Sequence, residues 1–107
     1  GFHLHTTGRC DAPDFTSAGG HLNPGDRSHG RLSAQGPHLG DLTNLQVGSD
    51  GTVTATVEVP NVRADALAQI FDADGTAVMI HAGPDDYRSD PAGDAGSRVA
   101  CGVLVRS

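Results

Sequence analysis

Residues 8–40 form one continuous stretch without any sustained periodic pattern of apolar side chains. Helices and strands that bury one face show apolar periods of about 3.6 or 2 residues, and neither period occurs here. Irregular segments of this length are uncommon inside a compact domain unless they have a function or are tied down internally. The chain must therefore fold around a long loop, and something must hold that loop in place.

The rest of the chain offers few large apolar side chains for this purpose. Of its 107 residues, 36% are hydrophobic and 4% aromatic, and Trp is absent. A single domain of this size with so few core residues often depends on a disulfide or a structural metal. Cys10 and Cys101 lie near opposite ends of the chain, and their spacing alone does not distinguish a disulfide from two free thiols.

The charge of the chain limits the kinds of molecule that it can bind. The formal net charge is −6, and every basic residue other than His is Arg. An acidic surface repels phosphate groups, which argues against nucleic acid or an anionic membrane as a partner. No apolar run is long enough to span a bilayer, and the sequence after Gly1 lacks a signal-peptide pattern. We therefore expect neither nucleic acid nor a membrane as a partner.

Short strand patterns flank the irregular segments. Strands are predicted at residues 1–7, 41–47, 52–59, 76–80 and 98–105. The turn signal Ser49-Asp50-Gly51 predicts that the second and third of these strands form a hairpin. Residues 62–71 have a weak helical tendency, and residues 82–97 form a second loop rich in Gly and Asp. Short strands with two long loops indicate an antiparallel all-β domain.

The histidines cluster in a way that favours metal binding. Side chains two residues apart on a strand share a face, so His3 and His5 can converge on one metal ion. Farther along, His21, His29, His38 and Asp41 offer three imidazoles and a carboxylate, which suit a tetrahedral zinc site. A metal would supply the constraint that this polar loop lacks. The alternatives are scattered surface or core histidines and a solvated loop rich in Gly and His.

Several short motifs occur in this chain in the same order as in one known protein family. They are GFHLH at residues 1–5, Cys10, FTSAGGHLNP at 15–24, His29-Gly30, GPHLGDL at 36–42, IHAG at 80–83 with Asp85-Asp86, and GSRVACGV at 96–103. Together they resemble the copper/zinc superoxide dismutases, most of all the bacterial branch, over nearly the whole chain. The resemblance implies an all-β Greek-key antiparallel barrel or sandwich, incomplete at the N-terminus, with two long functional loops. It implies one partial domain over residues 1–107, with the first three strands absent.

The resemblance also implies two metal sites, with one copper and one zinc per chain. The implied copper ligands are His3, His5, His21 and His81, and the implied zinc ligands are His21, His29, His38 and Asp41. In this scheme His21 bridges the two ions and also donates a proton to the departing peroxide.

The resemblance assigns further roles around these sites. Asp85 would hydrogen-bond to His3 and His29, and Cys10 and Cys101 would form a disulfide. Arg98 would attract the anionic substrate, superoxide, with Arg88 as a helper.

The implied activity is the conversion of two superoxide anions to dioxygen and hydrogen peroxide by redox cycling of copper. One alternative is a non-catalytic copper- and zinc-binding fragment or module, and another is a structural part of a larger extracellular protein. The disulfide and the bacterial likeness imply a periplasmic or extracellular location. The family also allows a homodimer.

Overall fold

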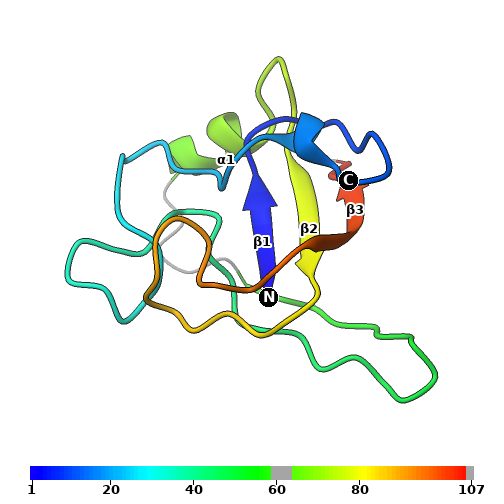
Figure 1. Cartoon of the computed structure of the whole chain (residues 1–107). Coiled ribbons are helices and arrows are strands. Elements are labelled where there is room, and N and C mark those ends of the chain that lie inside the picture. The colour runs from blue at the N-terminus through cyan, green and yellow to red at the C-terminus, as the bar shows by residue number, and fades with distance from the viewer. Residues whose placement is uncertain (59–63, 106–107) are drawn as a thin grey trace.

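The computed structural model describes residues 1–58 and 64–105. Within these residues, three strands form an antiparallel sheet of order β1-β2-β3 (Figure 1). The strands are β1 (Phe2–His5), β2 (Ala77–His81) and β3 (Arg98–Val103). A short 3-10 helix, η1 (Thr16–Ala18), lies in the first loop, and the helix α1 (Ala64–Ile70) precedes β2. The first loop (residues 8–40) follows β1 and the second loop (residues 82–97) follows β2. Because β1 pairs with β2, both loops start from neighbouring strands of one sheet.

The strand register places the first two histidines on one face of the sheet. His3 lies opposite Met79, His5 opposite Ala77, and Met79 opposite Cys101. Side chains alternate between faces along a strand, so these residues share a face. The pairing of β2 with β3 shifts between Ile80 and His81. Such an irregularity re-aims a side chain, and here it falls on the last histidine of the chain.

Two small apolar clusters pack on the two faces of the sheet. One consists of Leu4, Leu22, Leu42 and Ile70. The other consists of Ala18, Ala77 and Met79, against which the Cys10–Cys101 disulfide packs. The disulfide implied by the resemblance is thus confirmed, and it ties the first loop to β3. On the first face Phe2 and Val78 are only half-buried, so the sheet is less completely covered there.

The predicted hairpin of residues 41–47 and 52–59 is wrong for the part that the structure describes. Residues 42–58 are irregular. Leu42 and Val57, near the two ends of this segment, pack in the Leu4 cluster, and the middle of the segment projects from the body as a long loop, drawn in green in Figure 1. Two backbone hydrogen bonds close the turn at its tip, from the Gly48 N–H to the Thr52 carbonyl at 2.8 Å and from the Gly51 N–H to the Gly48 carbonyl at 2.9 Å. Alternation of apolar and polar residues stabilises a strand where one face is buried, and an isolated two-stranded hairpin is marginal in water. Residue 59 lies outside the described residues.

The other elements agree with the sequence analysis, and their bounds differ by a few residues. Strands occur within the predicted ranges 1–7 and 98–105, and the strand predicted at 76–80 runs one residue further, to His81. The weak helical tendency corresponds to α1 (Ala64–Ile70). The fold is mainly antiparallel sheet as predicted, and this sheet is not closed into a barrel. Among the described residues, no helix is both long enough and apolar enough to span a membrane.

Candidate metal centre

The first loop returns twice to β1 and brings more polar side chains beside His3 and His5. Isolated β-bridges join His5 to His21 and His3 to Asp41. The backbone of Leu4 reinforces both returns, because its carbonyl accepts from the N–H of Leu22 and its own N–H donates to a carbonyl of the same loop, each at 2.8 Å. All six histidines of the chain are buried, with at most 9% of each exposed.

Four imidazoles converge on one point. The ligand atoms of His3, His5, His21 and His81 lie within 4.8 Å of one another. One ring nitrogen of each, Nδ1 of His3 and Nε2 of the other three, is buried without a hydrogen-bond partner among the described residues. Buried polar atoms are nearly always paired, so four unpaired nitrogens in one place need an explanation. A metal ion at this point would pair all four.

The second ring nitrogen of three of these histidines is held by a hydrogen bond. The distances are 2.5 Å from His3 Nε2 to Asp85 Oδ2, 2.7 Å from His5 Nδ1 to the Gly19 carbonyl, and 2.9 Å from His81 Nδ1 to the Gly96 carbonyl. A carbonyl only accepts, so in His5 and His81 the bonded nitrogen carries the proton and the other nitrogen keeps a free lone pair. Metal-binding histidines are commonly oriented in this way.

A second group of donor atoms surrounds Asp41. Its Oδ1 lies 2.9 Å from His21 Nδ1, 3.0 Å from His29 Nδ1 and 3.3 Å from His38 Nδ1. His38 Nδ1 is also 3.3 Å from His21 Nδ1. Three imidazoles and one carboxylate match a tetrahedral zinc shell. His21 belongs to both groups, with Nδ1 toward Asp41 and its unpaired Nε2 available to the other group.

Grouping by ligand distance alone also places His3 with His21, His29 and Asp41. We assign His38 and not His3 to the second group, with His21, His29 and Asp41, because Nε2 of His3 is already bonded to Asp85. The backbone N–H groups of Gly30 and His38 donate to the other oxygen of Asp41, at 2.8 and 2.9 Å, and fix the carboxylate in this position.

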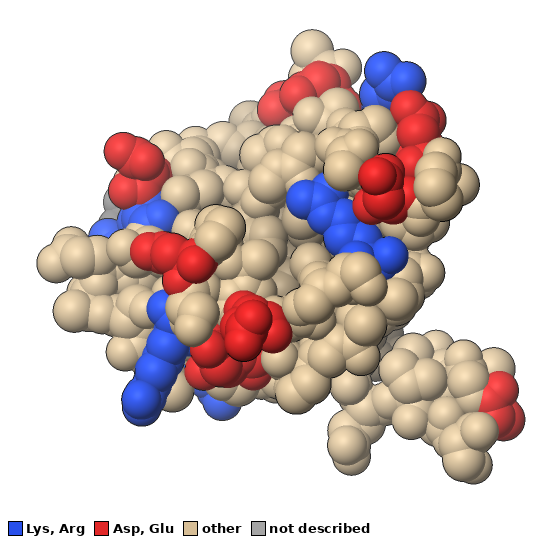
Figure 2. All heavy atoms as spheres, viewed as in Figure 1, with Lys and Arg blue, Asp and Glu red and all other residues tan. Residues whose placement is uncertain are grey.

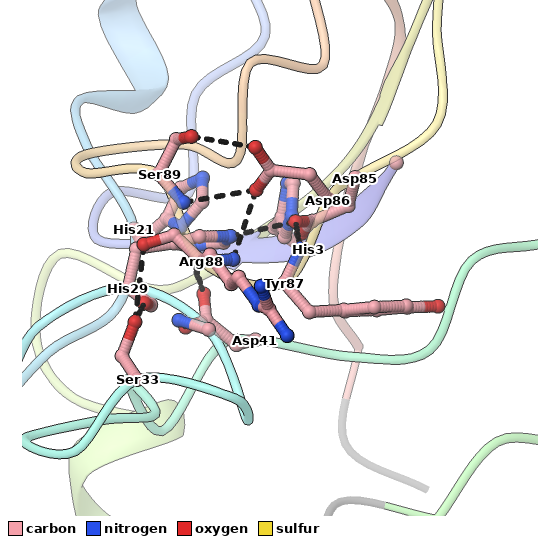
Figure 3. A network of polar contacts seen from close by, with 12 residues as sticks. His3, His21, His29, Ser33, Asp41, Asp85, Asp86, Tyr87, Arg88 and Ser89 are labelled. Carbon is pink, nitrogen blue, oxygen red and sulfur yellow. Dashed lines mark hydrogen bonds and ion pairs between the residues drawn. The ribbon is translucent and has the colours of Figure 1, made fainter.

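The buried Asp85 connects the two groups. Its Oδ2 meets His3 Nε2 at 2.5 Å, and its Oδ1 meets His29 Nε2 at 2.8 Å. The Tyr87 N–H also donates to Oδ1, at 2.7 Å. Figure 3 shows this carboxylate amid the polar network where the two loops meet. One carboxylate thus orients a ring from each group.

Burial keeps the first group of imidazoles neutral. Burial, followed by the neighbouring His21, lowers the pKa of His3 to about 3. Burial also lowers the pKa of His5 to about 4, and it lowers the pKa of His21 and of His81. Metal ions bind the deprotonated ring. At neutral pH these rings therefore already have the protonation state that metal binding requires.

The second group differs in its charge. Burial acts to lower the pKa of His29, but the carboxylates of Asp41 and Asp85 outweigh it and raise this pKa to about 9. For Asp41, burial acts to raise the pKa, but His21 and His29 outweigh it and hold the pKa far below its usual range. In the metal-free protein His29 is thus a cation between two carboxylates.

Arg98 lies beside the first group at the start of β3. Its guanidinium is half-buried and donates from Nη1 to the Phe15 carbonyl at 2.8 Å and from Nη2 to the Gly19 carbonyl at 2.7 Å. The Gly19 carbonyl is the one that also accepts from His5. Arg88 is exposed on the second loop, where its carbonyl accepts from Ser33.

Acidic side chains are spread over the face shown in Figure 2, and the basic ones form separate small patches among them. A local positive charge therefore has a strong effect on which anions approach this face.

Two residues that hold the second loop in place, Asp90 and Asn44, were not predicted from the sequence. The His29 N–H donates to Asp90 Oδ1 at 2.5 Å, and the side chain of Asn44 bonds to the backbone of Asp85. These partners lie 61 and 41 residues apart in sequence. No local pattern marks such pairs, although Asn44 follows Asp41 by three residues, and that short spacing is the one signal that the sequence offers.

Comparison with known proteins agrees with this geometry. The family model described as "Copper/zinc superoxide dismutase (SODC)" matches residues 1–104. Superoxide dismutase [Cu-Zn] 1 of Aquifex aeolicus (strain VF5) is 50% identical over 105 residues, which cover 96% of this chain and 62% of that protein. The superoxide dismutase-like protein YojM of Bacillus subtilis (strain 168) is 43% identical over 107 residues, covering 98% and 55%.

Solved structures show the same likeness. A double mutant of a SOD-like protein from Bacillus subtilis superposes with a TM-score of 0.90 at 44% identity, covering 99% of this chain and 71% of that one. The Cu/Zn superoxide dismutase from Brucella abortus gives a TM-score of 0.72 at 34% identity, covering 97% and 70%.

The chain spans 55–62% of the length of the curated relatives that it matches. The matches nevertheless extend over nearly all of its own residues, including both histidine groups and the disulfide. This chain belongs to the copper/zinc superoxide dismutase family.

Proposed function

We propose that this chain is the metal-binding part of an enzyme that dismutates superoxide, with one copper and one zinc per chain. The proposed copper ligands are His3, His5, His21 and His81, and the proposed zinc ligands are His21, His29, His38 and Asp41. The observation that carries the proposal is the set of four buried, unpaired ring nitrogens that converge beside a second set of three imidazoles and a carboxylate.

The donor sets suit these two metals. Imidazole is a good ligand for copper, and a closed shell of three imidazoles and a carboxylate is suited to zinc. When bound, copper supplies the one-electron redox chemistry that turns two superoxide anions into dioxygen and hydrogen peroxide. The protein supplies ring orientation through Asp85 and two backbone carbonyls, and it buries the histidine side chains that would bind the ions.

Two residues of the chain act on the substrate in this proposal. Arg98 holds a fixed positive charge beside the first group, which draws a small anion toward a chain whose formal net charge is −6. His21 Nε2 is one of the four nitrogens that would bind copper, and while it is not bound to the ion it could hold a proton for the departing peroxide. Its Nδ1 stays fixed at 2.9 Å from Asp41.

The test is to load the purified chain with copper and zinc, determine both metals on the same sample, and measure superoxide decay. We expect about one ion of each kind per chain and, once unbound ions have been removed, a decay rate above that of the metal-free chain. The matched control is His81→Ala, which removes a proposed copper ligand and leaves the proposed zinc ligands intact. Full metal content without accelerated decay would contradict the enzyme and favour a non-catalytic copper- and zinc-binding module.

For location, we propose an oxidising compartment, which is the periplasm or the exterior of a bacterial cell. The support is the Cys10–Cys101 disulfide, since such bonds persist mainly in oxidising compartments. Fractionation of the source cells would test it, and recovery in the cytosol with reduced thiols would contradict it. Homodimer formation stays a prediction, and sedimentation velocity would decide it.

A further inference from the structure

We propose that Asn44 is a positioning residue for the zinc site, and that it acts by fixing Asp85. This inference rests on the proposed function, because it takes His29 and Asp41 as zinc ligands. It adds a residue outside the donor sets that we assigned above.

Asn44 occupies both backbone groups of Asp85. Its Nδ2 donates to the Asp85 carbonyl at 3.1 Å, and its Oδ1 accepts from the Asp85 N–H at 2.9 Å. In the described part of the chain, the backbone of Asp85 makes no other hydrogen bond. The polar groups of a buried residue need partners, so this amide is what satisfies the backbone of Asp85 at its observed position.

The rest of the chain holds Asn44 itself in place. Its backbone N–H donates to the Tyr87 hydroxyl at 3.0 Å, and the Tyr87 N–H in turn donates to Asp85 Oδ1 at 2.7 Å. Tyr87 has a φ of 64°, an uncommon conformation for a residue with a side chain, which requires local support. Only two residues separate Asn44 from Asp41, so the amide also links Asp85 to the second histidine group.

The two rings that Asp85 contacts are not equally fixed by other means. His3 lies on β1, where pairing with β2 and the bridge to Asp41 restrain its backbone. His29 lies in an irregular loop, and its backbone N–H is held by the exposed Asp90. A displaced Asp85 therefore releases the ring of His29 more than the ring of His3, and zinc binding is affected more than copper binding.

The experiment measures zinc and copper affinity of the full chain and of Asn44→Ala by competition with chelators. We expect zinc affinity to fall by up to about 10- to 100-fold, which is the usual cost of losing a group bonded to a metal ligand, here Asp85. Copper affinity is expected to change by less than zinc affinity. A second readout is the visible absorption of Co²⁺ bound in place of zinc, which reports the ligand geometry and is expected to change in the variant.

A matched control exists in the first loop. Asn23 makes the same pair of amide bonds with the backbone of Arg27, 2.8 Å each, without contact to Asp85. Asn23→Ala therefore removes an equivalent pair of hydrogen bonds and is expected to leave zinc affinity and the Co²⁺ spectrum unchanged. Asn44→Gln keeps the neutral amide but displaces it by one methylene, so it tests the inference if Asn44→Ala does not fold. We expect a fall of several-fold for this variant.

Three results would overturn the inference alone. They are unchanged zinc affinity in Asn44→Ala, equal losses in Asn44→Ala and Asn23→Ala, and unchanged affinity in a folded Asn44→Gln. A failure of the unaltered chain to bind zinc would overturn the proposed function, and the inference with it. Zinc binding by the unaltered chain thus distinguishes a failure of the inference from a failure of the proposed function.

Discussion

At the scale of single residues, the electrostatic role of Arg98 leads to a prediction about rate. Its guanidinium is fixed by two carbonyls beside the first histidine group, in a chain of formal net charge −6. Arg98→Ala is expected to slow superoxide decay by the metal-loaded chain about 10-fold or more, because a local positive charge raises the encounter rate of a small anion. The rate is also expected to depend less on salt, because screening acts on the charge that is lost.

Arg9→Ala is the control for Arg98. Arg9 is an exposed arginine that forms an ion pair with Asp11, at 2.7 Å. The Arg9→Ala substitution is expected to change the rate of superoxide decay little. An equal loss of rate in both variants would show that the overall charge matters and not the position of Arg98.

The different protonation of the two histidine groups predicts a difference in proton release. In the metal-free chain the pKa of His29 is raised to about 9, so below that pH zinc must displace a proton from it. Zinc loading at pH 7 is therefore expected to release about one proton per chain from His29, and this release is lost as the pH rises through 9. His3 and His5 have pKa values lowered to about 3 and 4, so copper loading releases no proton from them at pH 7.

Titration calorimetry in two buffers of different ionisation enthalpy measures this difference. Because zinc binding releases this proton, zinc affinity is expected to rise with pH up to about 9 and then to level off. Zinc binding at pH 7 without proton release would contradict the assigned protonation of His29.

At the scale of elements, the contact between the two loops depends on Gly30. It has a φ of 95°, and a Cβ atom on it would lie 1.9 Å from the Tyr87 carbonyl oxygen. Gly30→Ala is therefore expected to lower the free energy of unfolding by about 1–3 kcal/mol, with backbone strain and the separation of the loops both contributing. Zinc affinity is expected to fall as well, since Gly30 N–H donates to Asp41.

Gly51→Ala supplies the matched control for this change. Gly51 has a φ of 85°, but no atom lies within 4 Å of the position that its Cβ would take. Gly51→Ala therefore introduces a comparable backbone strain without a clash. The difference between the two variants in the free energy of unfolding, measured in urea, gives the contribution of the loop contact. Equal destabilisation would show that the loops do not depend on close approach at Gly30.

The elements also show what the sequence could and could not predict. The strands around His3, Met79 and Cys101 were predictable, because their alternation coincides with side chains that do become buried or disulfide-bonded. The alternation at residues 52–58 was misleading, because these side chains are mostly exposed, and Val53 is 38% exposed. A pattern of this kind gives the side on which a residue would lie, but it does not reveal whether anything covers that side.

The candidate site was more predictable than the fold, for a chemical reason. A metal-binding histidine is recognised by residue type and neighbouring motif, and the structure brings all six histidines of the chain together. Residues that act through hydrogen bonds to distant backbone, such as Asn44, carry no such mark. Their partners become apparent only when both loops are placed.

At the scale of the whole molecule, the metals are expected to contribute much of the stability. The two buried clusters contain few large side chains, and Met79 is the bulkiest side chain that is fully buried. A metal that binds only the folded chain stabilises it by about 4 kcal/mol when its free concentration is 1,000 times its dissociation constant. Removal of metals with a chelator is therefore expected to lower the unfolding temperature clearly, with the disulfide intact.

His38→Ala is the control for metal removal. This variant loses one of the donors near Asp41, so added zinc is expected to raise its unfolding temperature less than that of the unaltered chain. Identical unfolding temperatures with and without chelator would show that the fold is held by burial and the disulfide alone.

The Gly19 carbonyl has a consequence for how the molecule tolerates motion. This one oxygen accepts from the ring of His5 at 2.7 Å and from the guanidinium of Arg98 at 2.7 Å. When thermal motion displaces this part of the loop, both side chains are carried in the same direction, so their displacements are correlated. The separation between the positive charge and the buried ring then varies less than the position of either group. A small anion would meet the same arrangement at each encounter, even while the loop itself fluctuates.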